Sequence, residues 1–593
     1  MLGGYMGKVL EVDLSSGKIS SSDLNSAYAS KYIGGKGYGA KVLYDSVPVG
    51  ADPLGNDNLL ILMTGPLTGT IAPSSGRFAV ITKSPETGIF TDGHVGGYFG
   101  PKLKFAGFDG IIVRGKSSKP VYLHITSDKC SLLDARELWG KRIFETDEWL
   151  KSRYPGSSCG VIGPAGENLV KYACISFDCG HQAGRCGPGA VMGSKNLKAI
   201  VVEDGKNKPK YAEAEKFKAL VSELSTSLRT HPTRFKRHIL GTLACIWEGI
   251  DGGILPIKNF SAVEFEGILN LVPEKLWEKG IWAGNTTCYA CPVACTKLSR
   301  LKSGEYKGKK YEAPEYEPVV LLGCNCGIDN YDRVVYAHIL CNDLGLDAIS
   351  AGNAIGFSME CYEKGLIKNG IRFGDGAGLI DLIKKIAYKE GLGDLLAQGV
   401  RAAANEIGGE ASRFAMQVKG LELPGVDPRG SYGMALAFAT ADRGGCHQRA
   451  WTARAELYGR LKREGVVKFV KESQDERAAC FSLDLCDFMP FSEKAFAGLL
   501  TYATGLQYTA EDYVRAGERI WNLTRLLAVR EGISRKDDTL PRRVMEEPML
   551  AGAAKGQYVP KEAMDKMLDE YYELRGWDNN GIPTKEKLAE LEK

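Results

Sequence analysis

Short apolar runs rich in β-branched residues alternate with polar turns along the N-terminal third of the chain. "KVLEVDL" (8–14) and "KIS" (18–20) flank the turn "SSG", which predicts an opening β-hairpin. Similar runs, punctuated by Gly and Pro, follow at 58–65, 77–84, 110–116, 120–126 and 198–205. This spacing predicts an antiparallel β-sheet or sandwich-like domain at the N-terminus.

The pattern changes to helical spacing after a polar segment with one proline (203–216), which we interpret as a linker. Apolar residues at helical periodicity predict helices at 214–230, 332–345, 376–391, 518–532 and 560–576. A stretch rich in Pro and Gly (419–433) fits either a break between two helical domains or a functional loop. The predicted fold class is therefore α+β, with a β-rich domain (1–208) followed by two mainly α-helical domains (209–420 and 421–593).

Composition and charge narrow the function classes. Of the 593 residues, 44% are hydrophobic and 25% charged, which is typical of a folded globular protein. The net charge is +4 and the basic residues are spread along the chain, which gives no argument for nucleic-acid or membrane binding. The most apolar stretch (58–72) is interrupted by Gly65, Pro66 and Gly69 and is too short to span a membrane. Charged residues near the N-terminus, such as Lys8, argue against a signal peptide. We expect a cytoplasmic protein whose 16 cysteines are reduced thiols or metal ligands.

A C-x₂-C-x₃-C run in "CYACPVAC" places Cys288, Cys291 and Cys295 close together. We expect the sulfurs to converge from one face of a helix or a tight helical turn. Zinc and a [4Fe–4S] cluster both take four thiolates, and the lack of a second zinc half-site favours a cluster over a zinc knuckle or free thiols. Cys486 is the preferred remote ligand, ahead of Cys480. The alternatives that stay open are Cys324, Cys326, Cys341 and Cys446.

Two Gly-rich stretches (74–110 and 181–200) each carry an interleaved arginine. Glycines let the backbone approach a ligand closely, and arginine binds phosphate, so the repetition suggests a phosphate-bearing cofactor with two similar halves. The alternative is a pair of β-turns with surface arginines. In "CNDLGLDAIS" (341–350), polar side chains surround a glycine, and the competing interpretation is helix capping.

Acid–base candidates lie in two places. His447 sits in a loop with glycines and arginines, and His94 in the first Gly-rich stretch, whereas His124 alternates with apolar residues as in a strand. Before the apolar run in "EAPEYEPVVLLG", Glu317 is a candidate general base, and Glu312 is expected in a solvated acidic turn.

Taken together, these motifs resemble the tungsten-containing aldehyde:ferredoxin oxidoreductase family over nearly the whole chain. The matching segments are "GKVLEVDLSSGK", "IGGKGYGAKVLYD", "SGRFAVITKSP", "GGYFGPKLKFAGFDGIIVRGK", "GRCGPGAVMGSKNLKAI", "CYACPVAC", "PEYEP", "NDLGLDAIS", "DRGGCHQRA" and "LRGWDNNGIPTKEKL".

The resemblance implies a tungsten bis-pterin cofactor on the β domain, a Mg²⁺ ion bridging the pterin phosphates and one [4Fe–4S] cluster. The residues implied at the phosphates and magnesium are Arg77, His94, Gly96, Arg185, Cys186, Gly187 and Gly189. Asn342, Leu346 and Asp347 are implied at one pterin, and Cys486 and Asp487 at the other. The implied cluster ligands are Cys288, Cys291, Cys295 and Cys486, and Glu317 and His447 are implied beside the tungsten.

The chain departs from the family pattern at four of these motif positions. Asn342 and Phe481 stand where the family has Asp, Asp484 where Gly is common, and His94 where Asn is typical.

By resemblance, we expect reversible oxidation of an aldehyde to a carboxylic acid, with electrons passing to ferredoxin or an Fe–S partner subunit. We expect no nucleic-acid partner, and either a homodimer or a hetero-oligomer. The alternatives are a tungsten-dependent aromatic acyl-CoA reductase subunit, whose relatives carry Cys at the position of Glu317, and a non-catalytic Fe–S electron-transfer subunit.

Overall fold

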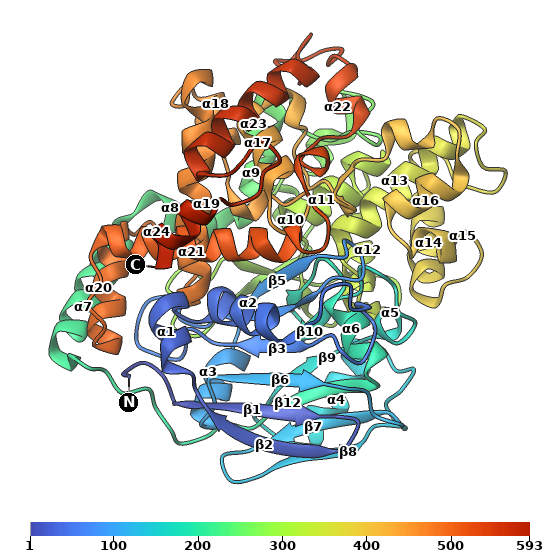
Figure 1. Cartoon of the computed structure of the whole chain (residues 1–593). Coiled ribbons are helices and arrows are strands. Elements are labelled where there is room, and N and C mark those ends of the chain that lie inside the picture. Colours follow the sequence, from blue (N-terminus) through green and yellow to red (C-terminus); the bar gives the residue numbers. More distant parts are fainter. Residues whose placement is uncertain (1, 593) are drawn as a thin grey trace.

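Two six-stranded sheets form the base of the molecule in the computed structural model, which describes residues 2–592 (Figure 1). The first sheet has the order β2-β1-β6-β3-β4-β5 and the second the order β11-β10-β9-β12-β7-β8. The strands are β1 Lys8–Asp13, β2 Lys18–Asp23, β3 Leu60–Met63, β4 Phe78–Lys83, β5 Phe90–Val95, β6 Gly110–Arg114, β7 Val121–Ile125, β8 Cys130–Asp134, β9 Ser158–Val161, β10 Ile175–Phe177, β11 His181–Ala183 and β12 Leu197–Val202.

The opening hairpin is confirmed, since β1 and β2 pair antiparallel from Lys8 opposite Asp23 to Asp13 opposite Lys18. The sheets are not purely antiparallel, however. β1 pairs parallel with β6, and β7 pairs parallel with β12. Parallel neighbours need long crossover connections, and here each crossover includes helices and other strands, so local turn signals could not reveal it.

One apolar core lies between the two sheets. Leu62 and Val80 of the first sheet and Leu123 and Ile200 of the second belong to the same cluster of buried side chains. The ring of Phe78 is also part of it, with aromatic neighbours from β10 and from α3 (Phe99–Phe105) at centroid distances of 4.9 and 5.0 Å. The two sheets therefore pack face to face, as in the predicted sandwich-like domain.

Helices cover the other face of the first sheet. Ile61 and Ile81 point away from the inter-sheet core and pack with Leu43 of α2, Ile520 of α21 and Tyr571 of α23. Figure 1 shows α2 directly above the strands, with the helices of the C-terminal third beyond it. Sequence-distant segments thus enclose the β domain from above.

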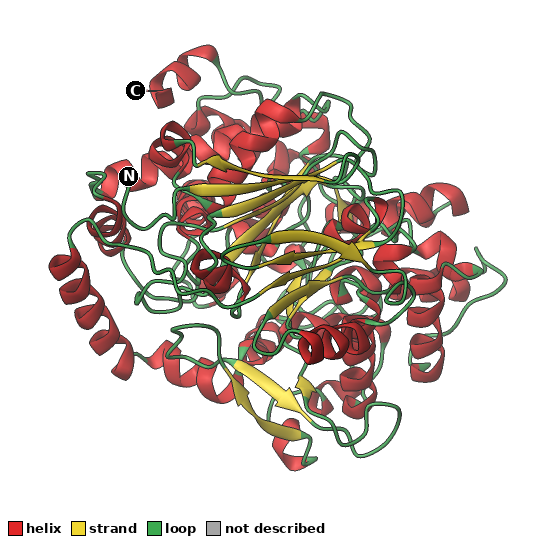
Figure 2. Cartoon of the chain, turned by 90° about the horizontal axis from the view of Figure 1, so that it is seen from below, coloured by secondary structure: helices red, strands yellow, loops and turns green. Residues whose placement is uncertain are grey.

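A second apolar core belongs to the helices of the middle third, α11 to α16. Figure 2 shows the helices arranged around the central strands, with a small group of strands apart from the main sheets. That group is the three-stranded sheet β13 Trp282–Thr286, β14 Thr296–Ser299 and β15 Tyr311–Glu312, and a further pair is β16 Gln417–Val418 with β17 Leu421–Glu422.

Each of the predicted helices is present, and the ends are close to those expected except for α21, which begins at Ala510 where the prediction began at 518. The helices are α1 Ser26–Tyr32, α2 Gly35–Ser46, α3 Phe99–Phe105, α4 Ile143–Arg153, α5 Pro164–Glu167, α6 Pro188–Ser194, α7 Ala214–Thr230, α8 Pro232–Leu240, α9 Cys245–Gly252, α10 Lys275–Glu278, α11 Tyr316–Leu322, α12 Tyr331–Leu344, α13 Ala348–Glu363, α14 Gly376–Tyr388, α15 Leu392–Leu396, α16 Val400–Ile407, α17 Tyr432–Thr440, α18 Ala453–Leu457, α19 Val466–Leu483, α20 Glu493–Thr504, α21 Ala510–Val529, α22 Arg542–Glu546, α23 Lys561–Arg575 and α24 Lys585–Glu592.

The segments interpreted as a linker and as a domain break or functional loop differ in burial. Residues 203–213 connect β12 to α7 without a helix or strand and are largely exposed or half-buried. Residues 419–433 are almost entirely buried, and Gly425 contacts a predicted site residue, as described below. The second segment therefore contributes to the site, which favours the functional-loop interpretation.

Candidate active site

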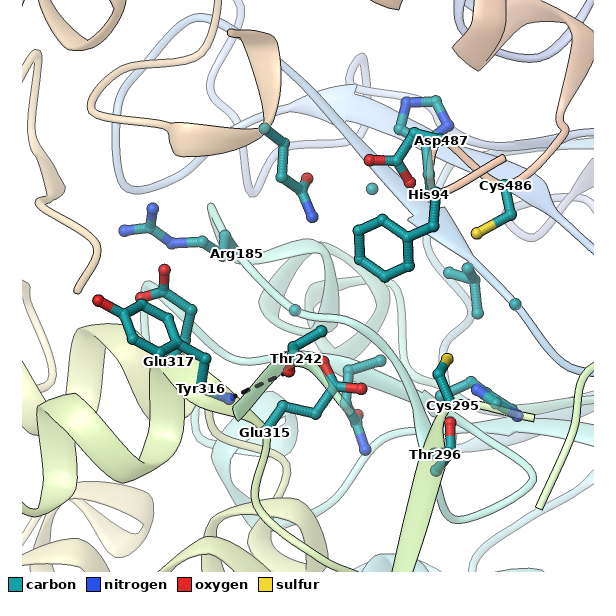
Figure 3. Close-up of a pocket in the computed structure, with 18 of the residues that line it drawn as sticks. His94, Arg185, Thr242, Cys295, Thr296, Glu315, Tyr316, Glu317, Cys486 and Asp487 are labelled. Atoms are coloured by element: carbon teal, nitrogen blue, oxygen red, sulfur yellow. Dashed lines mark hydrogen bonds between the residues drawn. The ribbon is translucent and has the colours of Figure 1, made fainter. Parts of the chain in front are cut away.

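A cavity of about 560 Å³ lies where the β domain meets the helices. It collects the predicted residues from segments far apart in the sequence. Those that line it are Arg77, His94, Gly96, Arg185, Cys288, Cys291, Cys295, Glu317, Asn342, Leu346, Asp347, His447, Cys486 and Asp487. In Figure 3, Arg185 and Glu317 lie on one side of the space, and Cys295 and Cys486 on the other.

The cysteine run is a loop of tight turns instead of a helix. Ala290 and Ala294 have positive φ angles of 50° and 48°, which break any helical repeat. The loop is fixed to the first Gly-rich stretch by backbone hydrogen bonds: Tyr289 N–H donates to Gly97 O (3.2 Å) and Ser74 N–H donates to Ala290 O (2.8 Å). The tertiary contact, and not helical periodicity, holds this loop in place.

Cys486 lies beside the cysteine run. Its backbone N–H donates to Ser74 O (3.3 Å), so Ser74 bonds to both cysteine segments. Cys480, by contrast, is buried in α19 with its Sγ directed to Leu485 O. The cavity therefore brings together the preferred set of four cysteines.

Four other cysteine candidates are buried and do not line the cavity: Cys324, Cys326, Cys341 and Cys446. Within residues 2–592, no three His, Cys, Asp or Glu side chains are grouped as ligands of a single metal ion. A four-iron cluster binds each thiolate through a different iron, and its ligands accordingly stand farther apart.

Arg77 connects the β domain to the Cys486 segment. Its guanidinium donates to His94 O (2.9 Å) and Cys486 Sγ (3.3 Å), and lies 3.4 Å from Asp487 Oδ1. Burial opposes its charge, but Cys486 and Asp487 raise the pKa of Arg77 well above its ordinary value. This arginine is a permanent cation next to the cysteine set, and the interpretation as a surface arginine is wrong for it.

Three of the residues that depart from the family pattern contact one another. The His94 ring stacks on Phe481 at a centroid distance of 4.1 Å, and its Nδ1 lies 3.6 Å from Asp484 Oδ1. Its Nε2 hydrogen-bonds with Asp92 Oδ2 (2.7 Å), which also pairs with the buried Lys36 at 3.2 Å. The His94, Phe481 and Asp484 substitutions therefore form one local unit.

Arg185 lines the opposite wall and is buried. Its Nε lies 3.3 Å from Asp347 Oδ2, and its Nη1 donates to Gly445 O (2.9 Å). Asp347 is also the N-cap of α13 and accepts from the backbone of Ser350. The capping interpretation of this motif is thus correct, and the same carboxylate faces the cavity.

Cys186, Gly187 and Gly189 do not line the cavity. Cys186 and Gly187 both have positive φ (70° and 77°), and a Cβ on Gly187 would meet Lys171 O at 2.1 Å. A Cβ on Gly189 would meet Cys174 O at 2.3 Å. These residues form the tight turn that leads from Arg185 into α6, so they position the arginine from behind.

Asn342 and Leu346 line the cavity near the end of α12. The Asn342 side-chain amide contacts His338 Nε2 at 3.1 Å, and Leu346 forms a β-bridge with Ala173. Gly345, between them, has φ 81° and ends the helix, which turns the chain toward the wall of the cavity.

Glu317 and His447 face each other from different parts of the chain. Glu317 lies in the first turn of α11, and its Oε2 accepts from Gly425 N–H (2.6 Å). Its Oε1 has no hydrogen-bond partner within residues 2–592 and lies 3.7 Å from His447 Nε2. Desolvation raises the pKa of Glu317 to about 7, and burial beside Arg185 lowers the pKa of His447 to about 3. The pair is a carboxyl group able to exchange a proton near neutral pH and a neutral imidazole.

Glu312 is not in a solvated turn. It ends β15, lines the cavity, and burial raises its pKa well above the ordinary value. Sequence reasoning also missed the contributions of Ser74 and Gly425, which act through backbone atoms, and of Arg477, which pairs with Asp487. No side-chain pattern marks such backbone roles.

The lining chemistry fits a large anionic cofactor. Arginine side chains reach the cavity from both halves of the molecule: Arg77, Arg185, Arg237, Arg443 and Arg477. Several buried polar atoms there have no protein partner, among them Glu317 Oε1, His447 Nδ1 and His338 Nδ1. Buried polar atoms normally have partners, so these point to a bound group in the cavity.

Family models match both parts of the chain. The model described as aldehyde ferredoxin oxidoreductase, N-terminal domain, matches residues 9–204, and the model described as domains 2 and 3 matches residues 219–592. The chain therefore belongs to the aldehyde ferredoxin oxidoreductase family of enzymes, as the sequence resemblance predicted.

Curated relatives match over the full length. The chain is 40% identical to the tungsten-containing aldehyde ferredoxin oxidoreductases of Pyrococcus furiosus and Thermococcus kodakarensis, covering 99% of each chain. It is 33% identical to an aliphatic sulfonate oxidoreductase, WOR-like subunit, of P. furiosus, covering 99% of this chain and 97% of the relative.

A solved structure is similar throughout the fold. It is the active site complex BamBC of benzoyl coenzyme A reductase in complex with 1,5-dienoyl-CoA, with a TM-score of 0.86 and 27% identity, covering 100% of this chain and 97% of that chain. The α+β fold class predicted from the sequence is thereby confirmed. Over residues 2–592, no helix combines the length and apolar character needed to cross a membrane.

Proposed function

We propose that this protein oxidises aldehydes to carboxylic acids reversibly, and passes the electrons through one [4Fe–4S] cluster to ferredoxin or to an Fe–S partner subunit. The observation that carries the proposal is the joint position of Glu317, His447 and the four cysteines around one cavity. The relatives that share 40% identity are tungsten-containing aldehyde ferredoxin oxidoreductases, which supports the same reaction class.

The arginine-rich walls suit a tungsten bis-pterin cofactor with a Mg²⁺ ion between its phosphates. When bound, this cofactor supplies the two-electron redox chemistry that side chains cannot provide. Arg77 and Arg185 would hold the phosphates, with His94 and Gly96 beside them. Asn342, Leu346 and Asp347 would contact one pterin, and Cys486 with Asp487 the other.

Glu317 acts as the general base. Its free Oε1 faces the cavity, and the Gly425 N–H holds the other oxygen, which fixes the direction of the carboxylate. A carboxyl group with a pKa of about 7 can remove a proton from the attacking water or the aldehyde hydrate at neutral pH and release it afterwards.

His447 orients the carbonyl group. Its low pKa keeps the imidazole neutral at neutral pH, so it can donate one N–H to the carbonyl oxygen, where negative charge develops. The distance of 3.7 Å between its Nε2 and Glu317 Oε1 supports a shared role for the two side chains at one point of the cavity.

The cysteine set provides the electron exit. Cys288, Cys291, Cys295 and Cys486 would ligate the cluster, with the cationic Arg77 donating to one sulfur. An external acceptor is required, because the sequence contains one cluster motif. The 16 free thiols suit the reducing cytoplasm, and we keep the homodimer and the hetero-oligomer as the two assembly hypotheses.

Metal analysis followed by an aldehyde panel with a viologen dye tests the proposal. We expect about one tungsten and about four irons per chain, and aldehyde-dependent dye reduction. Protein with iron or zinc but no tungsten, and no dye reduction, would instead identify a non-catalytic Fe–S electron-transfer subunit.

An aromatic acyl-CoA reductase subunit is the second candidate, and the similarity to the BamBC complex favours it. Glu317 stands where the resemblance implies a cysteine in those relatives, and Cys324 and Cys326 follow α11 outside the cavity lining. These two facts favour aldehyde chemistry. Benzoyl-CoA-dependent oxidation of reduced viologen, in the absence of any aldehyde activity, would reverse the order of the two candidates.

A further inference from the structure

Exposed apolar side chains gather around the loop of residues 288–295, here called the cluster loop. Ala290 and Pro292 of this loop are exposed, so it reaches the molecular surface. On one side lies Tyr98, 42% exposed, whose ring is 6.3 Å from that of Tyr289. Ile71, 49% exposed, belongs to the same side, since its segment bonds to the cluster loop through Ser74.

Helix α8 borders the other side of the cluster loop. Its Arg234 Nε donates to Pro292 O (3.0 Å), and its His238 Nδ1 lies 2.9 Å from Val293 O. None of its residues is buried, and Phe235 and Ile239 are 49% and 54% exposed. Figure 1 shows α8 on the same side of the molecule as α7. An amphipathic helix whose apolar side chains are exposed to solvent is unusual on the surface of a monomer and is typical of a protein–protein contact site.

The surface around Phe235 and Ile239 is basic. The α8 sequence "PTRFKRHIL" contributes Arg234 and Lys236 to this surface and contains no acidic residue, whereas its Arg237 lines the cavity. The exposed Arg229 lies at the end of α7. Lys236 pairs with Glu248 at 3.1 Å, but Arg229 has no ion-pair partner among the described residues. An acidic partner would therefore find complementary charge around a small apolar centre.

We propose that α8 and the cluster loop, with Ile71 and Tyr98, form the docking surface for a small, acidic iron–sulfur electron carrier. The inference rests on the proposed function, because it assumes that the cluster loop holds the electron exit. Oxidation of one aldehyde with water releases two electrons and two protons, so two oxidised one-electron carriers dock in turn and each leaves reduced.

A transient carrier fits this surface better than a permanent subunit. The apolar residues are few and separated, whereas permanent interfaces bury about 2,000 Å² or more and are strongly apolar. Redox encounters use small contact areas and depend on charge for fast association. The basic rim of α8 provides that charge beside the loop that would carry the cluster.

Two variants test the surface, with Leu550→Ser as the matched control. Phe235→Ser/Ile239→Ser removes the apolar centre, and Arg229→Glu reverses a rim charge. Leu550 is 72% exposed in the loop after α22, outside the surface. Aldehyde-dependent reduction of a purified acidic [4Fe–4S] ferredoxin and of benzyl viologen is measured for each protein.

We expect each test variant to raise the KM for ferredoxin about tenfold, as for the loss of a contact-site residue. Viologen reduction and iron content should stay at the wild-type values, and the control should match the wild type in every assay. The wild-type KM should also increase with salt, and Arg229→Glu should flatten this dependence.

The outcomes separate the two proposals. Wild-type protein that reduces neither viologen nor ferredoxin would refute the proposed function. Normal viologen activity with unchanged ferredoxin kinetics in both variants would refute the docking surface alone. If the wild type is a dimer and the Phe235→Ser/Ile239→Ser variant is a monomer, the surface binds a second copy of the chain. If a permanent Fe–S subunit co-purifies with the wild type and is lost only from the variants, the surface binds that subunit. Either result would refute the proposal that a transient carrier docks there.

Discussion

Replacing Glu317 by Gln removes the proposed base while keeping the size of the side chain. Burial raises the pKa of this carboxyl from 4.5 to about 7. At about 1.36 kcal/mol per unit, ionising it inside the cavity costs about 3 kcal/mol more than in water. The folded protein favours the protonated form of Glu317. The contribution of this protonated carboxyl group to the free energy of unfolding is therefore complete below pH 4.5 and is lost as the pH rises through about 7.

The same pKa determines the activity profile. Since only the ionised form accepts a proton, kcat/KM should fall about tenfold per pH unit below about pH 7 and level off above it. The kcat/KM of the Gln variant should be about 10²- to 10⁴-fold lower. Its kcat/KM should also lack the decrease below about pH 7, here called the acid limb.

The assay is viologen reduction with a good aldehyde between pH 5 and pH 9, on preparations of equal tungsten and iron content. Glu315→Gln serves as a matched control, because Glu315 is two residues away, lines the same cavity and lacks contact with Gly425. We expect the control to keep the acid limb. A Glu317→Gln enzyme with wild-type kcat/KM and an unchanged acid limb would refute the role as base.

Two further changes test the cluster ligand and the turn behind Arg185. Cys486→Ser should lower the iron content from about four atoms per chain and also lower the tungsten content, whereas Cys480→Ser should change neither. Equal metal content in the two variants would contradict the assignment of Cys486 as a cluster ligand. Gly187→Ala should lower the free energy of unfolding by about 3 kcal/mol or more, because its φ is positive and the new methyl meets Lys171 O at 2.1 Å. Gly459→Ala, with positive φ and open space, should cost only about 1 kcal/mol in the same denaturant titration.

Local sequence patterns determined the elements and the chemical inventory. The α7 helix spans the predicted 214–230, and the hairpin of β1 and β2 follows its turn signal, because backbone propensity and side-chain periodicity act over a few residues. The cysteine run was equally visible, since a cluster needs several thiolates close together. Local context made Cys486 and His447 candidates, and the family resemblance then assigned Cys486 to the cluster and His447 to the tungsten site.

Tertiary structure decided how these parts meet. The parallel pairing of β1 with β6 joins strands separated by about half of the β domain, and the cluster loop is held by Ser74 and Gly97 instead of a helical repeat. The raised pKa of Glu317 likewise cannot be read from its sequence neighbourhood, because burial in the folded chain causes it. The backbone N–H of Gly425, more than one hundred residues away, opposes the rise and fixes the carboxylate. Long-range burial and backbone contacts depend on the whole chain, so only the folded structure specifies them.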